Sequence, residues 1–179
     1  MARTFTLNFP STAFFPGGFS TAGPTFKNHG TGAYNRVSVA FDGASTENAV
    51  TGMFVMPDEY VGDSSTHKLK ANICYYTNNT SSTNNNIQIL ASIEGIADGA
   101  TTDLQAAQSF DDSPSPDVVT IPTVQGSLDI HTYDLTTEGA DDGIAAGNMA
   151  RLAIVRLGGS DGYGNDMFLA SVSLYEETV

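Results

Sequence analysis

The chain has 179 residues, of which 40% are apolar, and a formal net charge of −13 at pH 7. This length suits one domain, and the negative charge argues against nucleic acid and anionic membrane surfaces as partners, because like charges repel. Only 15% of the residues are charged, below the usual ~25%, and Ser, Thr, Asn and Gly fill the difference. No run of ~18 apolar residues and no secretory-type leader is visible, so a soluble protein made in a cytoplasm is expected.

Residues 1–33 differ in kind from the rest of the chain. They hold six of the ten phenylalanines, separated by prolines and glycines. No period of 2 or 3.6 persists after Phe9, and Pro and Gly oppose helices and interior strands. We expect an extended N-terminal arm that buries its rings either on its own domain or across a neighbouring subunit, and we predict the intermolecular clamp. The partner-binding side chains would be Phe5, Phe9, Phe14, Phe15, Phe19 and Phe26.

Residues 34–179 alternate between apolar and polar side chains in eight segments, and this period of two indicates β-strands. They are Tyr34–Asp42, Asn48–Met56, Lys68–Thr77, Ile87–Ala97, Asp117–Pro122, Ser127–Thr136, Met149–Leu157 and Phe168–Tyr175. The predicted fold class is all-β, an eight-stranded antiparallel jelly roll or β-sandwich. A jelly roll pairs its first core strand with its last, here Tyr34–Asp42 with Phe168–Tyr175. The predicted core contains Val39, Phe41, Ile73, Ile89, Ile93, Leu152, Ile154, Val172 and Leu174.

The connections carry further expectations. The link from Gly158 to Asp166 has four glycines, so the last two strands are expected to form one long antiparallel hairpin. The polar stretch Asn78–Asn86 is expected to be another hairpin turn. Within the long connection Asp98–Pro116, residues Asp103–Gln108 could form one helical turn.

Candidate chemistry is sparse. His29, His67 and His131 have no metal-ligand spacing and no neighbouring nucleophile, and no phosphate-binding glycine loop precedes a helix. The prediction is therefore a protein that is not an enzyme. One alternative stays open, a β-sandwich glycosidase whose two catalytic carboxylates are distant in the sequence. Cys74 is the single cysteine, and we expect it to pack as a small apolar residue.

No cofactor is predicted, and there is one weak metal candidate. Asp161, Asn165 and Asp166 lie in the glycine-rich link and carry oxygen ligands of the kind calcium prefers. A plain polar turn is the favoured interpretation of the same residues. An aromatic platform for a glycan is also conceivable, since the chain has no Trp but has Tyr60, Tyr75, Tyr76 and Tyr163; the edge of the core is the more common place for such rings.

Several motifs frame the predicted strands. They are Met56-Pro57-Asp58-Glu59-Tyr60, Ile93-Glu94-Gly95-Ile96-Ala97-Asp98-Gly99, Ala145-Ala146-Gly147-Asn148-Met149-Ala150-Arg151-Leu152-Ala153-Ile154-Val155-Arg156 and Leu169-Ala170-Ser171-Val172-Ser173-Leu174-Tyr175. Together these motifs resemble those of small jelly-roll structural proteins of tailed bacteriophages. The resemblance covers about Val50–Tyr175, and Asn148 and Ser171 stand where the pattern has Asp and Gly.

The resemblance implies a virion protein without an active site. The expected function is capsid decoration: a homotrimer on the capsid surface that binds the major capsid protein and stabilises the lattice, partly through the N-terminal arm. The alternative is a glycan-binding module of a head fibre or tail appendage. A docked arm and a flat apolar subunit face would favour the first function, and exposed tyrosines over a groove would favour the second.

Overall fold

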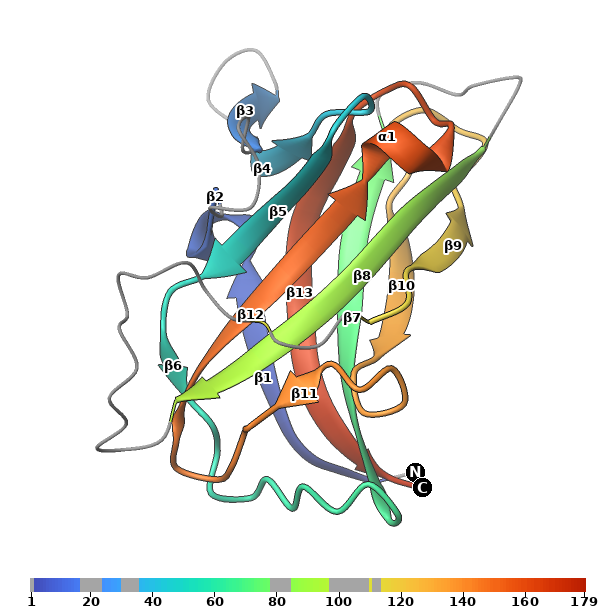
Figure 1. The fold of residues 1–179 in the computed structure, drawn as a ribbon. Coiled ribbons are helices and arrows are strands. Elements are labelled where there is room, and N and C mark those ends of the chain that lie inside the picture. The colour runs from blue at the N-terminus through green and yellow to red at the C-terminus, as the bar shows by residue number, and fades with distance from the viewer. Residues whose placement is uncertain (1, 17–23, 30–35, 78–84, 97–109, 111–113) are drawn as a thin grey trace.

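The computed structural model describes residues 2–16, 24–29, 36–77, 85–96, 110 and 114–179. These residues form two facing β-sheets, and the chain is a β-sandwich (Figure 1). Among them no helix is long and apolar enough to span a membrane. The all-β prediction is confirmed at the level of a two-sheet sandwich, but the described residues contain more strands than the eight expected.

The first sheet has six strands in the order β10-β7-β13-β4-β3, and β1 also pairs with β13. All of its pairings are antiparallel. The strand bounds are β1 Arg3–Pro10, β3 Thr25–His29, β4 Arg36–Phe41, β7 His67–Thr77, β10 Asp129–Asp134 and β13 Met167–Thr178. The predicted pairing of first and last core strands is confirmed, since Phe41 lies opposite Met167 and Val39 opposite Leu169.

The second sheet has seven strands in the order β11-β8-β12-β5-β2, with β6 paired to β12 and β9 to β8. Its bounds are β2 Phe14–Pro16, β5 Thr46–Thr51, β6 Phe54–Val55, β8 Asn86–Ile96, β9 Asp117–Thr120, β11 Asp141–Asp142 and β12 Met149–Leu157. Only the short β11–β8 pairing is parallel among the described strands of this sheet. The predicted strand Asn48–Met56 is therefore two, because the chain leaves the sheet at Gly52 and Met53.

The core lies between the sheets. Burial alternates strictly along β7 and over the first half of β8, so one face of each strand points inward. All nine residues predicted to be buried are in the core, from Val39 on β4 to Leu174 on β13. Burying apolar side chains in this way is the main driving force for folding, and the alternation in the sequence is sufficient to identify them.

The expected hairpin of the last two long strands is wrong. β12 pairs with β8 and β5, whereas β13 pairs with β7, β1 and β4, so the two strands belong to opposite sheets. The glycine-rich link includes the short helix α1, Gly158–Asp161, and turns the chain from one sheet to the other. The hairpin expected at Asn78–Asn86 is also wrong, because the strands that it joins, β7 and β8, lie in different sheets. Most of the connection Asn78–Asn86 and all of Asp103–Gln108 lie outside the described residues.

The described parts of residues 1–33 are not a separate arm. β1 runs beside β13, β2 pairs with β5 and β3 pairs with β4, so this segment contributes strands to both sheets. A 3₁₀ turn, η1 Ser11–Ala13, connects β1 to β2. The prolines that argued against strands stand at strand ends, since Pro10 closes β1 and Pro16 closes β2, positions where a missing N–H costs little.

The six phenylalanines of this segment have different environments. Phe14 is fully buried, and Phe5 and Phe9 pack partly buried against the core. Phe15 and Phe26 are 55% and 48% exposed, and Phe19 lies outside the described residues. Phe5, Phe9 and Phe14 therefore pack on the chain's own domain, which is one of the two expected alternatives. Phe15 and Phe26 are exposed at the surface.

Candidate functional site

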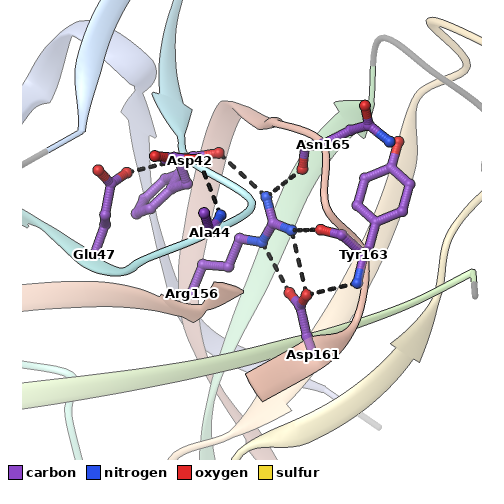
Figure 2. Close-up of polar contacts among 8 residues, drawn as sticks. Asp42, Ala44, Glu47, Arg156, Asp161, Tyr163 and Asn165 are labelled. Carbon is purple, nitrogen blue, oxygen red and sulfur yellow. Dashed lines mark hydrogen bonds and ion pairs between the residues drawn. The ribbon is translucent and has the colours of Figure 1, made fainter. Parts of the chain in front are cut away.

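The weak metal candidate is organised around an arginine. Arg156 at the end of β12 is 0% exposed, and its guanidinium faces the buried carboxylate of Asp161. Nε donates to Asp161 Oδ2 at 2.9 Å and Nη2 to Oδ1 at 3.4 Å (Figure 2). Nη1 donates to the carbonyls of Asn165 at 2.7 Å and Phe41 at 3.2 Å, and Nη2 donates to the carbonyl of Tyr163 at 2.6 Å.

The guanidinium thus occupies the place that a calcium ion would need. Asp161 neutralises Arg156, Asn165 contributes its backbone carbonyl to the same cation, and Asp166 forms a 3.7 Å ion pair with Lys27 at the surface. Among the described residues no group of three or more His, Cys, Asp or Glu is arranged to hold a metal ion. The loop is best explained as a structural corner that a buried ion pair holds in place.

The histidines do not form a common site in the described structure. Nε2 of His131 on β10 lies 2.8 Å from Asp117 Oδ2 on β9, joining the two sheets at their edge. Nδ1 of His67 lies 2.9 Å from the Thr66 hydroxyl in an exposed turn. The side chain of His29 is outside the described part of the chain.

The outer face of the six-stranded sheet carries a row of polar side chains that crosses four strands. Strand pairing places Asn8 of β1 opposite Ser173 of β13, Ser173 opposite Asn72 of β7, and Asn72 opposite Thr132 of β10. These four residues are called the amide row below. Neighbouring strands lie ~4.8 Å apart, so the row spans roughly 14 Å.

The amide row is ordered by its own hydrogen bonds. The Ser173 hydroxyl donates to Asn8 Oδ1 at 2.7 Å, and the Thr132 hydroxyl donates to Asn72 Oδ1 at 2.8 Å. The Tyr175 hydroxyl donates to the same Asn72 oxygen at 3.3 Å. Because the amide oxygens accept these bonds, the two amide NH₂ groups and the hydroxyl lone pairs can form further hydrogen bonds.

One cation–π contact and one ion pair lie next to the amide row along the strands. The guanidinium carbon of Arg3 lies 3.8 Å from the centre of the Tyr175 ring. Lys70 Nζ donates to Glu177 Oε1 at 2.6 Å, and this bond is the main reason why the pKa of Lys70 is raised. On the side of the amide row nearest the chain termini, Lys70 is therefore ion-paired and Arg3 is held against an aromatic ring.

A groove of about 470 Å³ lies on the side of the amide row away from the chain termini. Residues of η1, β4, β7 and β13 line it. Tyr76 is its aromatic residue; the ring stacks on Phe168 at a centroid distance of 5.1 Å, and its hydroxyl donates to Ser38 Oγ at 3.1 Å. Cys74, between the groove and the amide row, is half-buried, and burial raises the pKa of its thiol. Of the four tyrosines considered as an aromatic platform, only Tyr76 lines this groove.

The other three tyrosines belong to the interior or its edge. Tyr75 and Tyr163 are fully buried, and Tyr60 is half-buried with an edge-to-face contact to Phe5. The asparagines of the amide row were not identified from the sequence. Residues 8, 72, 132 and 173 are adjacent only through strand pairing, and no spacing along the chain marks them.

Comparison with known proteins gives a likeness of fold. No protein-family model and no curated protein sequence matches the chain. Among solved structures it is similar to a family 35 carbohydrate-binding module from an environmental isolate, with 11% identity, a TM-score of 0.50 and 97% of both chains covered. It is also similar to part of an arabinose-bound α-L-arabinofuranosidase, with 13% identity and a TM-score of 0.51, covering 95% of this chain and 24% of the enzyme. The architecture is therefore that of a carbohydrate-binding-module-like jelly roll.

Proposed function

We propose that this protein is a glycan-binding module and that the outer face of its six-stranded sheet contacts the glycan. The observation that carries the proposal is the amide row, in which hydroxyls from neighbouring strands hold the amide oxygens of Asn8 and Asn72. Sugars present vicinal hydroxyls that both donate and accept, and a row of NH₂ donors and hydroxyl acceptors is complementary to them. A pre-ordered surface also loses less side-chain entropy when it binds.

The charges nearby favour an uncharged glycan. The charge of Lys70 is neutralised by Glu177, and the guanidinium of Arg3 is stacked on the Tyr175 ring. The chain as a whole carries −13, which opposes the approach of uronic acids and sulfated sugars. The row is about 14 Å long by strand spacing, enough to contact more than one sugar ring.

The groove around Tyr76 extends the proposed surface. Aromatic rings pack against the apolar faces of sugars, and Tyr76 combines such a ring with a hydroxyl that is already hydrogen-bonded to Ser38. Fold likeness to a carbohydrate-binding module agrees with this assignment but does not decide it, because one fold hosts many functions. The amide row contains no carboxylate or imidazole, which supports binding without catalysis.

The test is a binding measurement with neutral polysaccharides, by affinity electrophoresis followed by calorimetry. Replacing both Asn8 and Asn72 by Ala removes two amide donors. Since each hydrogen bond contributes about 0.5–1.5 kcal/mol, the loss of two should weaken binding by about 1–3 kcal/mol, or roughly 5- to 160-fold. Gln88→Ala, which removes an amide from β8 in the other sheet, is the matched control and should bind like the parent. Equal affinity of the double variant and the parent would refute the assignment of this face.

Capsid decoration is a second proposal, and a different surface supports it. Phe15 on β2 and Phe26 on β3 are exposed on the outermost strands of the two sheets, on the same side of the sandwich (Figure 1), and Val37 of β4 is 40% exposed. Exposed apolar groups at strand edges suit contact with another copy or with a capsid protein. Together with the resemblance to phage virion proteins, they motivate a homotrimer that binds the capsid surface.

Light scattering and co-sedimentation with capsids test that second proposal. A Phe15→Ser/Phe26→Ser variant should keep its fold and lose trimers or capsid binding, while the Asn8/Asn72 double variant should keep both. If the unmodified protein is monomeric and does not sediment with capsids, the capsid-decoration proposal is wrong. A protein that binds both capsid and glycan would be an appendage module of a virion.

A further inference from the structure

The outer face of the seven-stranded sheet, away from the proposed glycan surface, contains an apolar hollow of about 370 Å³. It is called the outer hollow and is defined by Asn48, Leu90, Ser92, Phe110, Val155 and Leu157. Its volume lies at the lower end of the range for small-molecule sites.

Strand register explains which residues meet there. Val155 of β12 lies between Asn48 of β5 and Leu90 of β8. One row further along, Ala153 of β12 lies opposite Ser92 of β8. Two polar side chains therefore stand among aliphatic ones on the same face of three neighbouring strands.

Both polar side chains of the outer hollow lack a hydrogen-bond partner. Asn48 is 1% exposed and neither its amide oxygen nor its amide nitrogen is bonded; Ser92 is 4% exposed and its hydroxyl is unbonded. Buried polar groups in native proteins are almost always paired. Among the other described residues, Thr77, Asn85 and Arg151 each have one unbonded buried atom, whereas in the outer hollow two such side chains line the same space. The unpaired amide and hydroxyl thus mark the outer hollow as a place that a ligand completes.

The charges around the outer hollow restrict that ligand. Among the described residues that line it there is no Lys or Arg, and Glu47 is the one acidic residue; its carboxylate already accepts a hydrogen bond from the Asp42 backbone N–H at 2.7 Å. An anion would find no described cation to neutralise it and would lose its hydration, as a cation would, among Leu, Val and Pro side chains.

We propose that the outer hollow binds a compact, uncharged molecule with an apolar body and one carboxamide group. The amide of Asn48 would pair with the ligand amide, donor to acceptor and acceptor to donor, and Ser92 would take a third bond. Leu90, Val155, Leu157 and Phe110 would cover the apolar body. This site is separate from the amide row, and it stands whether or not that surface binds glycans.

The experiment titrates the ¹⁵N-labelled full chain with cyclohexanecarboxamide and, in parallel, with cyclohexanecarboxylate at pH 7. Saturable shifts of amide resonances on β5, β8 and β12 are expected, with at least tenfold tighter binding of the carboxamide. No saturable shift, or equal affinity for the two probes, would overturn the proposal.

Three variants assign the result to the outer hollow. Asn48→Leu should abolish the preference for the carboxamide and also raise the melting temperature, because it removes an unpaired buried amide. Ser92→Ala should weaken carboxamide binding severalfold, and it keeps the test valid if Asn48→Leu does not fold. Ala153→Leu should fill the space and exclude both probes, whereas Ser64→Ala in an exposed turn should bind both like the parent. A carboxamide preference that survives Asn48→Leu would contradict the proposed pairing.

Discussion

Replacing Arg156 by Met removes the cation around which the 158–166 corner is built. Arg156 and Asp161 are both buried, and all five N–H groups of the guanidinium point to acceptors. Methionine fits the aliphatic volume but leaves the buried Asp161 carboxylate without its cation, although the Tyr163 backbone N–H still donates to it at 2.9 Å. Three backbone carbonyls lose their donor at the same time.

The size of the effect follows from these contacts. Breaking a buried ion pair by removing one partner costs about 3–5 kcal/mol, and unpaired buried carbonyls place this case toward the upper end. Since domains are stable by about 5–15 kcal/mol, the loss is a large fraction of the total. For a chain of this length each kcal/mol shifts the melting temperature by about 2–4 °C, so a fall of roughly 6–20 °C is expected.

Calorimetry and denaturant unfolding measure the change, with Arg3→Met as the control at an exposed arginine. The double variant Arg156→Met/Asp161→Asn should recover part of the stability, because it no longer buries an unpaired charge. A loss below about 1 kcal/mol for Arg156→Met would refute the argument that the ion pair holds the corner.

Four other outcomes are expected. Gly95→Ala should lower the melting temperature, because its Cβ would collide with the backbone of the turn after β11, whereas Gly52→Ala meets no atom within 4 Å and is the control. Burial raises the pKa of Glu47, so the folded state holds its proton more tightly than the unfolded state; Glu47→Gln should therefore stabilise the protein at pH 7, with the gain shrinking as the pH falls to 4. Glu176 is buried and accepts from the N–H groups of residues 61 and 62, so Glu176→Ala should speed hydrogen exchange in that loop. A chelator should leave the melting temperature unchanged, because the Asp161 carboxylate is already paired with a guanidinium; a fall would revive the calcium interpretation.

The sequence by itself determined which faces of the strands are buried. Alternation along β4, β7, β8, β12 and β13 is a local property, since successive side chains on a strand point to opposite sides. For this reason the core residues and the main strands could be predicted without any knowledge of their neighbours. The pairing of β4 with β13 was also predicted correctly, because jelly-roll topology brings the first and last core strands together.

Apart from the β4–β13 pair, tertiary structure decided which strands are neighbours. Alternation does not encode the sheet to which a strand belongs, so β12 and β13 appeared to be a hairpin although they lie in opposite sheets. The candidate sites depend on this long-range information. Asn8 meets Ser173 across 165 residues, Thr132 meets Asn72 across 60 residues, and Asn48 joins Ser92 only through β12. Each contact is local in space and distant in sequence, and only the paired sheets bring these residues together.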